Sequence, residues 1–297
     1  MKSVLVTLAN DAYAAHAKQL FYSAQVRGRW GYDLCLLTDG LSPENRSWFA
    51  RRGIHIHEAQ PVGQLEGSRW PAVLLLKFEL FSTYFHTWDT VVFLDSDIIV
   101  VGPIGALAHK TGMRAVTDCQ PQLKWQLTVD GAVHEFLKSI GISPAASVFN
   151  AGVLVFEPRR IPPDRYGLIV EYFRQLKGSL VYPEQAVLNI AFHNEWKKLA
   201  SCYNVYVPLV RYLPTWMRSY RGPILHFNYS PKPWSRTSAF HENWSENMRH
   251  SASVRSGAGG NSGLANCRET VYSIIPNIAR RVYAMRLFWR EQGRRGQ

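Results

Sequence analysis

The chain is short of cysteine and lacks long apolar runs, and each shortage excludes a class of protein. Its 4 cysteines form no C-x-x-C pair, which argues against a disulfide framework and is typical of a reducing cytoplasm. No stretch approaches the roughly 20 apolar residues that cross a bilayer, so we expect no integral membrane protein. The opening MKSVLVTLAND predicts a first strand, because its apolar run of about seven residues is short for a secretion signal.

Acidic residues are also scarce relative to basic ones. The chain has 22 Asp and Glu against 34 Lys and Arg, a formal net charge of +12. Such an excess indicates an anionic partner, whether nucleic acid, acidic lipid or a phosphorylated substrate. Charge alone does not choose among these, but much of the excess lies in the last stretch, IARRVYAMRLFWREQGRRGQ.

Apolar runs alternate with helical patterns along most of the chain, which predicts an α/β domain with a mainly parallel sheet. The domain is expected to span residues 1–249, followed by a glycine-rich flexible linker at 250–266 and a tail at 267–297. The tail places Ile278, Val282 and Met285 on one helical face and arginines opposite. We expect this basic amphipathic helix to contact an anionic membrane; packing against the domain is the alternative.

The stretch VVFLDSDIIV, residues 91–100, predicts one buried strand with two acids inside it. Side chains two residues apart on an extended chain share a face, so Asp95 and Asp97 are predicted to bind one divalent cation while Ser96 points away. Burying two carboxylates without a partner costs several kcal/mol. The alternative is an aspartate-rich turn that bonds its own backbone.

A histidine and a lysine late in the chain extend this hypothesis. His226 ends an apolar strand in ILHFNYSPKPW, and Lys232 follows in a proline-containing loop. Two carboxylates and one imidazole suit Mn²⁺ better than Ca²⁺, with Mg²⁺ as the second choice. Lys232 is then placed to neutralise a diphosphate. The alternative is a structural histidine.

Three further residues stand out, each with a structural alternative. Lys77 lies among apolar residues in PAVLLLKFELF, which suggests an anionic partner, although lysines often reach solvent from such positions. Gly152 in FNAGVLVFEP permits a ligand to approach the backbone. Glu184 in PEQAVLN opens a helix, where an acid is also favoured by the helix dipole alone.

Taken together and in order, five motifs resemble one family. TLANDAY, a helix lysine ahead of VVFLDSDIIVV, FNAGVLVFEP, PEQAVLN and HFNYSPKPW are similar to the retaining glycosyltransferases of family 8, over residues 3 to about 234. That family includes glycogenin and bacterial lipopolysaccharide glucosyl- and galactosyltransferases. The resemblance implies a single GT-A type nucleotide-sugar-binding domain and a UDP-sugar donor.

The resemblance also implies roles for particular residues. The Mn²⁺ ligands are Asp95, Asp97 and His226. The catalytic candidates near the transferred sugar or the acceptor are Gln185, Glu184 and Asp118. The donor-binding residues are Leu8, Asn10 and Tyr13 at the uridine, with Lys77, Ser96, Asn150, Ala151, Gly152 and Lys232. The sequence departs from the family at Glu184, where aspartate is usual, and at Tyr229, where glycine is usual.

The leading hypothesis is a cytoplasmic enzyme, peripheral on the inner face of the cell membrane. It would move glucose or galactose with retention from a UDP-sugar to a glycan or lipid-linked acceptor, using Mn²⁺. A nucleotidyltransferase would show a glycine-rich, basic loop after the first strand, and TLANDAYAAH has none. Two rivals stay open: an inactive basic module for anionic lipid or nucleic acid, and a self-glucosylating primer like glycogenin. For the leading hypothesis no nucleic acid partner is expected.

Overall fold

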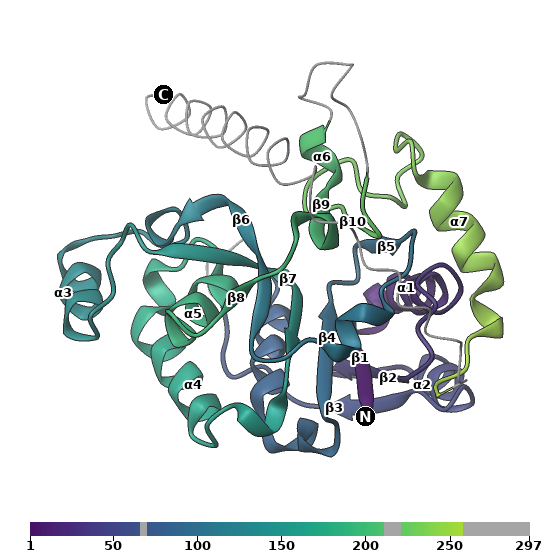
Figure 1. Ribbon diagram of the computed structural model, residues 1–297, viewed down its shortest axis with the longest axis horizontal. Coiled ribbons are helices and arrows are strands. Elements are labelled where there is room, and N and C mark those ends of the chain that lie inside the picture. The colour runs from purple at the N-terminus through teal and green to yellow at the C-terminus, as the bar shows by residue number, and fades with distance from the viewer. Residues whose placement is uncertain (66–69, 211–220, 258–297) are drawn as a thin grey trace.

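The computed structural model describes residues 1–65, 70–210 and 221–257, which form a seven-stranded sheet and a three-stranded sheet with helices around them (Figure 1). The large sheet has the order β3-β2-β1-β4-β7-β6-β8. Its first four strands are parallel: β1 (Ser3–Leu8), β2 (Asp33–Thr38), β3 (His55–Glu58) and β4 (Thr90–Leu94). They alternate with helices, as predicted, and the two α-helices of this half are α1 (Ala14–Val26) and α2 (Pro43–Ala50).

The other half of the large sheet changes direction. Strand β7 (Ser147–Phe156) is antiparallel to β4, β6 (Arg114–Gln122) is antiparallel to β7, and β8 (Lys197–Lys198) is parallel to β6. Three helices belong to this half: α3 (Gly131–Ser139), α4 (Arg165–Leu176) and α5 (Pro183–Ala191). Four of the six strand pairs in the described part of this sheet are parallel, which confirms the expected α/β fold with a mainly parallel sheet.

A small sheet crosses the end of the large one and brings distant segments together. It has the order β5-β10-β9, with β5 (Ile98–Val100) antiparallel to β10 (Ile224–His226) and β9 (Val205–Tyr206) parallel to β10. Helix α6 (Val207–Val210) follows β9, and α7 (His241–His250) packs on α1. Because Ile98 pairs with His226, this sheet carries the late histidine to the aspartate segment.

The prediction of one strand through residues 91–100 is wrong. Strand β4 ends at Leu94 and β5 begins at Ile98 in the other sheet, so the two acids lie in the turn between them. The backbone N–H of Ile98 donates to the carbonyl of Asp95 at 3.2 Å and closes this turn. Both flanking runs are fully buried, which is why they resemble a single strand in the sequence.

The apolar segment around Lys77, expected as a helix, forms two 3-10 helices, Ala72–Phe81 and Thr83–Thr87, instead of one α-helix. The first contacts β1 and β2 as well as α4 and α5. A 3-10 helix is more tightly wound than an α-helix and therefore slimmer, which suits a segment enclosed by other elements. This packing leaves Lys77 only 1% exposed.

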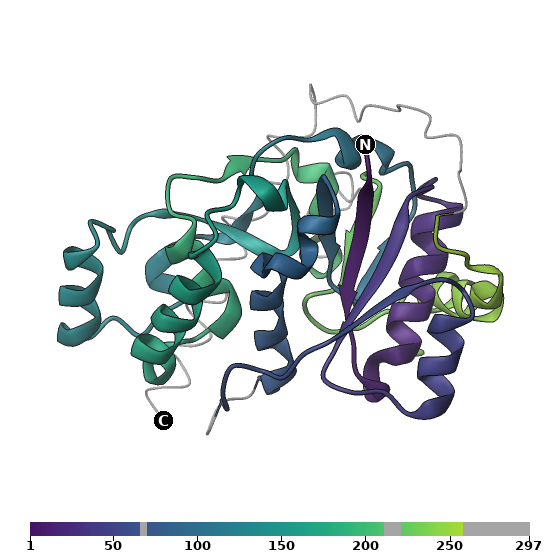
Figure 2. The ribbon, with the colours of Figure 1, turned by 90° about the horizontal axis from the view of Figure 1, so that it is seen from below.

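The core has two layers, one on each face of the large sheet. On one face Val4 and Val6 pack with the 3-10 segment, α4 and α5; on the other, Leu5 packs with the apolar side of α1. Figure 2 shows α1 beside β1 and β2. This alternation is the period-two pattern of a sheet covered on both faces.

The predicted linker and tail are described only in part. Residues through 257 pack on the domain: Val254 is fully buried, and the N–H of Gly257 donates to the carbonyl of Tyr32 at 3.2 Å. Residues 258–266 of the predicted linker and the tail at 267–297 lie outside the described residues. Within the described residues, none of the helices has the length and apolar character needed to cross a bilayer.

Candidate active site

A cavity opens where the carboxyl ends of β1 and β4 meet the small sheet and the start of α5. Ligands of open α/β sheets commonly bind at such strand ends. Every residue assigned a site role from the sequence lines the cavity, except Ala151 and Gly152. The lining set comprises Leu8, Asn10, Tyr13, Lys77, Asp95, Ser96, Asp97, Asp118, Asn150, Glu184, Gln185, His226 and Lys232.

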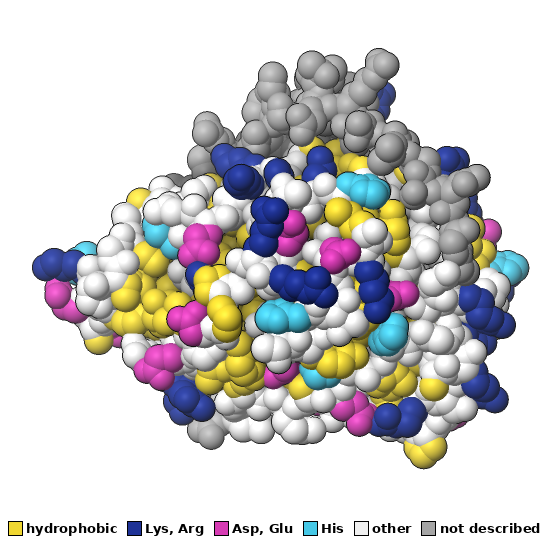
Figure 3. Space-filling view, turned by 60° about the horizontal axis from the view of Figure 1, so that its bottom comes forward, with side chains coloured by type: hydrophobic (Ala, Val, Ile, Leu, Met, Phe, Trp, Pro, Cys, Tyr) yellow, Lys and Arg dark blue, Asp and Glu magenta, His cyan; other side chains and the backbone are white. Residues whose placement is uncertain are grey.

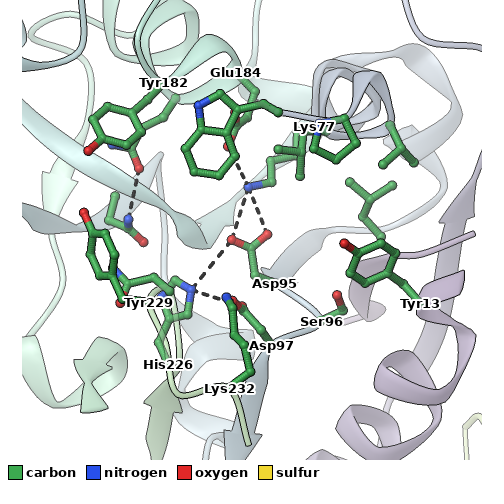
Figure 4. A pocket seen from close by; sticks show the side chains of 18 of the residues that line it. Tyr13, Lys77, Asp95, Ser96, Asp97, Tyr182, Glu184, His226, Tyr229 and Lys232 are labelled. Carbon is green, nitrogen blue, oxygen red and sulfur yellow. Dashed lines mark hydrogen bonds and ion pairs between the residues drawn. The ribbon is translucent and has the colours of Figure 1, made fainter. Parts of the chain in front are cut away.

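Three side chains of types that commonly ligate metals converge in the cavity. Asp95 and Asp97 come from the β4–β5 turn and His226 comes from the end of β10, and one ligand atom from each lies within 4.8 Å of the others. The Nε2 atom of His226 is 3.2 Å from Oδ1 of Asp97 and 3.9 Å from Oδ2 of Asp95. Figure 4 shows the three side chains turned toward one another.

The donor set fits a divalent cation. Oδ1 of Asp97 is buried and accepts no hydrogen bond from any residue that the structure describes, which is costly for a carboxylate oxygen unless a cation completes it. Two carboxylates with one imidazole are hard and borderline donors that suit Mn²⁺ or Mg²⁺. Burial alone would raise the pKa of Asp97, but the charge of Lys232, whose Nζ lies 2.6 Å from Oδ2 of Asp97, outweighs burial and lowers it.

Lys77 links the metal group to the start of α5. Its Nζ lies 2.9 Å from Oδ1 of Asp95 and 3.2 Å from Oε1 of Glu184 (Figure 4). Burial works to lower the pKa of Lys77, and the two carboxylates overcome burial and raise it, so the buried amine stays charged. Glu184 lies in the first turn of α5, but its carboxylate does not cap the helix, because it is directed to Lys77.

Lys232 approaches the same group from the loop after β10. Its Nζ is 2.6 Å from Oδ2 of Asp97 and 2.6 Å from the carbonyl oxygen of Phe227. The side chain is 31% exposed, in contrast to the 2% of Lys77. Lys232 is therefore the cation that an anionic ligand entering the cavity can reach.

A second group of cavity residues is built mainly from amides. The side chain of Asn150 donates to Oε1 of Gln185 at 3.0 Å and to Oδ2 of Asp118 at 3.2 Å. Gln185 also donates to Asp118 at 3.2 Å, and the N–H of Ala151 donates to Oε1 of Gln185 at 3.0 Å. Three predicted residues from β6, β7 and α5 thus form one connected group.

Gly152 has a different purpose from the one expected. A Cβ atom at this position would lie 2.3 Å from Cε1 of His226 and 3.0 Å from Oδ2 of Asp95. The close approach that the glycine permits is therefore by the side chains of His226 and Asp95, and Gly152 does not line the cavity. Ala151 does not line the cavity; its backbone N–H donates a hydrogen bond to Gln185 of the amide group.

The uridine-binding prediction concerned the loop after β1. Leu8 and Asn10 line the cavity with Tyr13, which is 39% exposed and lies across the cavity from Tyr182 and Tyr229 (Figure 4). Oδ1 of Asn10 is buried and has no hydrogen-bond partner among the described residues, so it is available to a polar ligand.

Sequence reasoning assigned no site role to several cavity residues, four of which are aromatic. Trp70, Tyr182 and Trp234 line the cavity, as does Tyr229, whose pKa is raised by burial. Trp234 is stacked on His16 of α1 with ring centroids 3.8 Å apart. Tyr182 directly precedes PEQAVLN and Trp234 ends the motif HFNYSPKPW, so these positions were the indication that the sequence offered.

The comparisons with known sequences agree on one family. The model of glycosyl transferase family 8 matches residues 4–238. Galactinol synthase 6 from Arabidopsis thaliana is 24% identical over 226 residues, covering 71% of this chain and 66% of that protein. Galactinol synthase 5 from the same plant is 24% identical over 207 residues, covering 64% and 61%. The chain therefore spans less than two thirds of the length of these curated relatives.

Solved structures share the fold. The galactosyltransferase LgtC, determined in complex with donor and acceptor sugar analogues, aligns with a TM-score of 0.63 at 20% identity over 83% of this chain and 95% of that chain. The glycosyltransferase GlyE of Streptococcus pneumoniae TIGR4 aligns with a TM-score of 0.57 at 19% identity, over 84% and 60% of the two chains. At these identities the likeness concerns the fold, and the expected GT-A type architecture is confirmed for the α/β domain.

Proposed function

Because this chain belongs to glycosyl transferase family 8, we propose that it is a retaining hexosyltransferase. It moves glucose or galactose from a UDP-sugar to a glycan or lipid-linked acceptor. The observation that carries the proposal is the convergence of Asp95, Asp97 and His226 beside the cavity, within 4.8 Å of one another. A module that bound only anions would gain nothing from two partly buried carboxylates facing an imidazole.

We assign the cation to Mn²⁺, held by the two aspartates and His226, with Mg²⁺ as the second choice. When bound, such a cation supplies Lewis acidity that stabilises the negative charge developing on a departing diphosphate. The fit rests on Oδ1 of Asp97, which is buried with no hydrogen-bond partner among the described residues.

Two lysines, Lys232 and Lys77, also have roles at the diphosphate and the donor. Lys232 is reachable from the cavity and would exchange part of its pairing with Asp97 for a phosphate oxygen, where a fixed positive charge favours departure of the leaving group. Lys77 is too enclosed to move far, so we assign it to holding Asp95 and Glu184 in place beside the donor.

The sugar is placed against the amide side. Asn150, Gln185 and Asp118 offer fixed donors and acceptors to sugar hydroxyls, and Glu184 extends from the start of α5 toward the same region. At the other end of the cavity, Leu8, Asn10 and Tyr13 take the uracil and ribose. The donor is thereby stretched across the floor, with its diphosphate over the metal-binding residues.

The proposals of a lipid-linked acceptor and of a membrane contact have less support from the described residues. The basic tail at 267–297, which motivated both a lipid-linked acceptor and a peripheral location on the cytoplasmic face, lies outside the described residues. Figure 3 shows one face of the described domain, on which Lys and Arg side chains are interspersed with Asp, Glu and His. Such a mixed distribution gives this face of the domain no strong preference for nucleic acid.

The proposal is tested by UDP release from UDP-glucose and UDP-galactose, with Mn²⁺ and with a chelator. Asp97→Asn keeps the shape and removes the charge, so we expect a loss of about 10³-fold in kcat. The control is Asp130→Asn, since Asp130 caps α3 by accepting from the N–H of Val133 and asparagine caps equally well. Its activity is expected to match the unmodified protein.

Each contrary result selects a different alternative. Turnover that survives the chelator and Asp97→Asn would remove the metal assignment. No turnover, together with no UDP binding by calorimetry in Mn²⁺, would favour the inactive basic module. A gain of whole hexose masses in the intact protein without any acceptor would favour the self-glucosylating primer.

A further inference from the structure

One buried asparagine connects the metal-binding histidine to the amide side of the cavity. Asn204 is fully buried at the end of the 3-10 helix Ser201–Asn204, directly before β9, and was not among the residues expected from the sequence. Its Oδ1 lies 2.9 Å from Nδ1 of His226, and its Nδ2 donates to Oδ1 of Asn150 at 2.9 Å. His226 is 2% exposed and Asn150 is 8% exposed, so water has little access to the connection.

The direction of every hydrogen bond in this connection follows from one backbone group. The N–H of Gly152 can only donate, and it lies 3.0 Å from Oδ1 of Asn150, which fixes that atom as the acceptor. The group of Asn204 that faces the same oxygen must therefore be its NH₂. The remaining Oδ1 of Asn204 faces His226 and can only accept, so Nδ1 of His226 carries the proton.

A second backbone group fixes the same polarity from the other end. The N–H of Ala151 donates to Oε1 of Gln185 at 3.0 Å, so this atom is an acceptor and the NH₂ of Asn150 is the donor that meets it. The orientation of Asn150 is thus determined twice. Both determinations leave its Oδ1 toward Gly152 and Asn204.

The consequence falls on the metal-binding atom. With the proton on Nδ1, the Nε2 atom of His226 presents a lone pair toward Oδ1 of Asp97 at 3.2 Å and Oδ2 of Asp95 at 3.9 Å. Three electron-pair donors then face one point, which is the arrangement that a cation requires. Ligating histidines are commonly held in one tautomer by such a bond from the other ring nitrogen.

We propose that Asn204 is a positioning residue that keeps Nε2 of His226 unprotonated and aimed at the cation, and that it couples this ligand through Asn150 to the residues around the transferred sugar. The inference rests on the proposed function, since it gives Asn204 a role in the same metal and donor site. Asn204 touches neither the donor nor the cation; it acts through His226 and Asn150.

Two substitutions separate the two contacts. Asn204→Leu removes both, and we expect Mn²⁺ affinity, measured by electron paramagnetic resonance titration in the presence of UDP, to fall by about 10- to 100-fold. Asn204→Asp keeps an acceptor for His226 but removes the donor to Asn150. We expect it to hold Mn²⁺ within a few-fold of the unmodified protein while the KM for the UDP-sugar rises.

The control is Asn247→Leu. Asn247 is also a buried asparagine, 4% exposed, and it donates to Gln19 at 3.4 Å outside the cavity. Its substitution tests the cost of losing a buried amide in general, and Mn²⁺ affinity is expected to stay unchanged. Equal weakening of Mn²⁺ binding in this control and in Asn204→Leu would overturn the proposal.

A measurement on the unmodified protein covers the case in which the variants do not fold. Nitrogen-15 resonances of histidine distinguish the Nδ1–H tautomer from the Nε2–H tautomer, and His226→Gln identifies the signal to assign. We expect Nδ1 of His226 to carry a proton; a neutral ring with its proton on Nε2 refutes the role of Asn204. If the tautomer is as expected but the protein binds no Mn²⁺ with UDP, the metal assignment fails and the positioning role stands.

Discussion

The two sides of the cavity hold their polar groups by different means. On the charged side, Lys77 and Lys232 pair with Asp95 and Asp97 beside His226. On the amide side, Asn150, Gln185, Asn189 and Asn204 are neutral, and Asp118 is the one acid of this connected set. The amide side is anchored to backbone groups, whereas the charged side is anchored mainly to itself.

The difference indicates a division of labour. A neutral amide bonded to backbone N–H and C=O groups has one favourable arrangement, so it preserves geometry through a reaction. An ion pair near a cavity can exchange one partner for a charged ligand, so it suits a place where a charged ligand binds. If this is correct, damage to the charged side should depend on pH and damage to the amide side should not.

The largest loss of unfolding free energy is expected from Lys77→Met, which removes a cation from the charged side. Methionine fills similar space but leaves Asp95 and Glu184 without their shared cation, and removing one partner of a buried pair costs about 3 to 5 kcal/mol. Urea denaturation at pH 7 measures the loss. Lys138→Met, which removes an exposed pair with Glu135, is the control and should be indistinguishable from the unmodified protein.

The pH dependence of this loss has a definite sign. The pKa of Lys77 is raised in the folded protein, so its contribution is fully present below its unfolded value of about 10.5 and does not vary between pH 4 and 9. Acid instead protonates the carboxylates that the variant leaves unpaired. The deficit of Lys77→Met should therefore shrink as the pH falls toward 4, and a deficit that grows in acid would contradict the assignment.

The residues of the two sides were not equally predictable from the sequence. Asp95, Asp97 and Lys77 were found because charged residues among apolar ones conflict with burial, and that conflict is visible in one short stretch. Asn204 carries no charge and lies in CYNVY, where nothing marks it. Its two partners are 22 and 54 residues away in the chain, so only the fold shows what it contacts.

The fold shows the same limit. Strands β1 to β4 and their helices were predictable because each is a local pattern of apolar residues. The division of residues 91–100 between two sheets was not, because the runs before and after the aspartates are equally apolar. Whether such a run continues a strand or starts another depends on its pairing partner, here β10, which lies more than 100 residues later.

An intermediate effect is expected from Asn189→Leu, which breaks the amide side beneath Gln185. Asn189 accepts from the N–H of Phe149 at 2.7 Å and donates to the carbonyls of Phe149 and Gln185, each at 2.9 Å. Leucine leaves these buried backbone groups unpaired, at about 2 kcal/mol of unfolding free energy. Because none of these groups titrates, the loss of unfolding free energy, measured by urea denaturation, should be the same at pH 7 and pH 5. A loss that changes with pH would contradict the distinction between the two sides.

The smallest change in unfolding free energy is expected from His16→Phe, at a residue next to the charged side. His16 is stacked on Trp234, whose ring lies 5.9 Å from the ammonium of Lys232. Burial lowers the pKa of His16 to about 4 in the folded protein. The unfolded chain takes up this proton near pH 6.5, so the unmodified protein loses stability as the pH falls from 6.5 toward 4.

Phenylalanine preserves the stack and removes this titration. Between pH 7 and pH 5, the unmodified protein should lose about 1 kcal/mol more unfolding free energy than His16→Phe, because solvent screens a ring that is only partly buried. Urea denaturation at pH 7, 6 and 5 measures both slopes. Parallel slopes would mean that His16 is protonated as easily in the folded protein as in the unfolded chain. His16 would then belong to the charged side, together with the ion pairs.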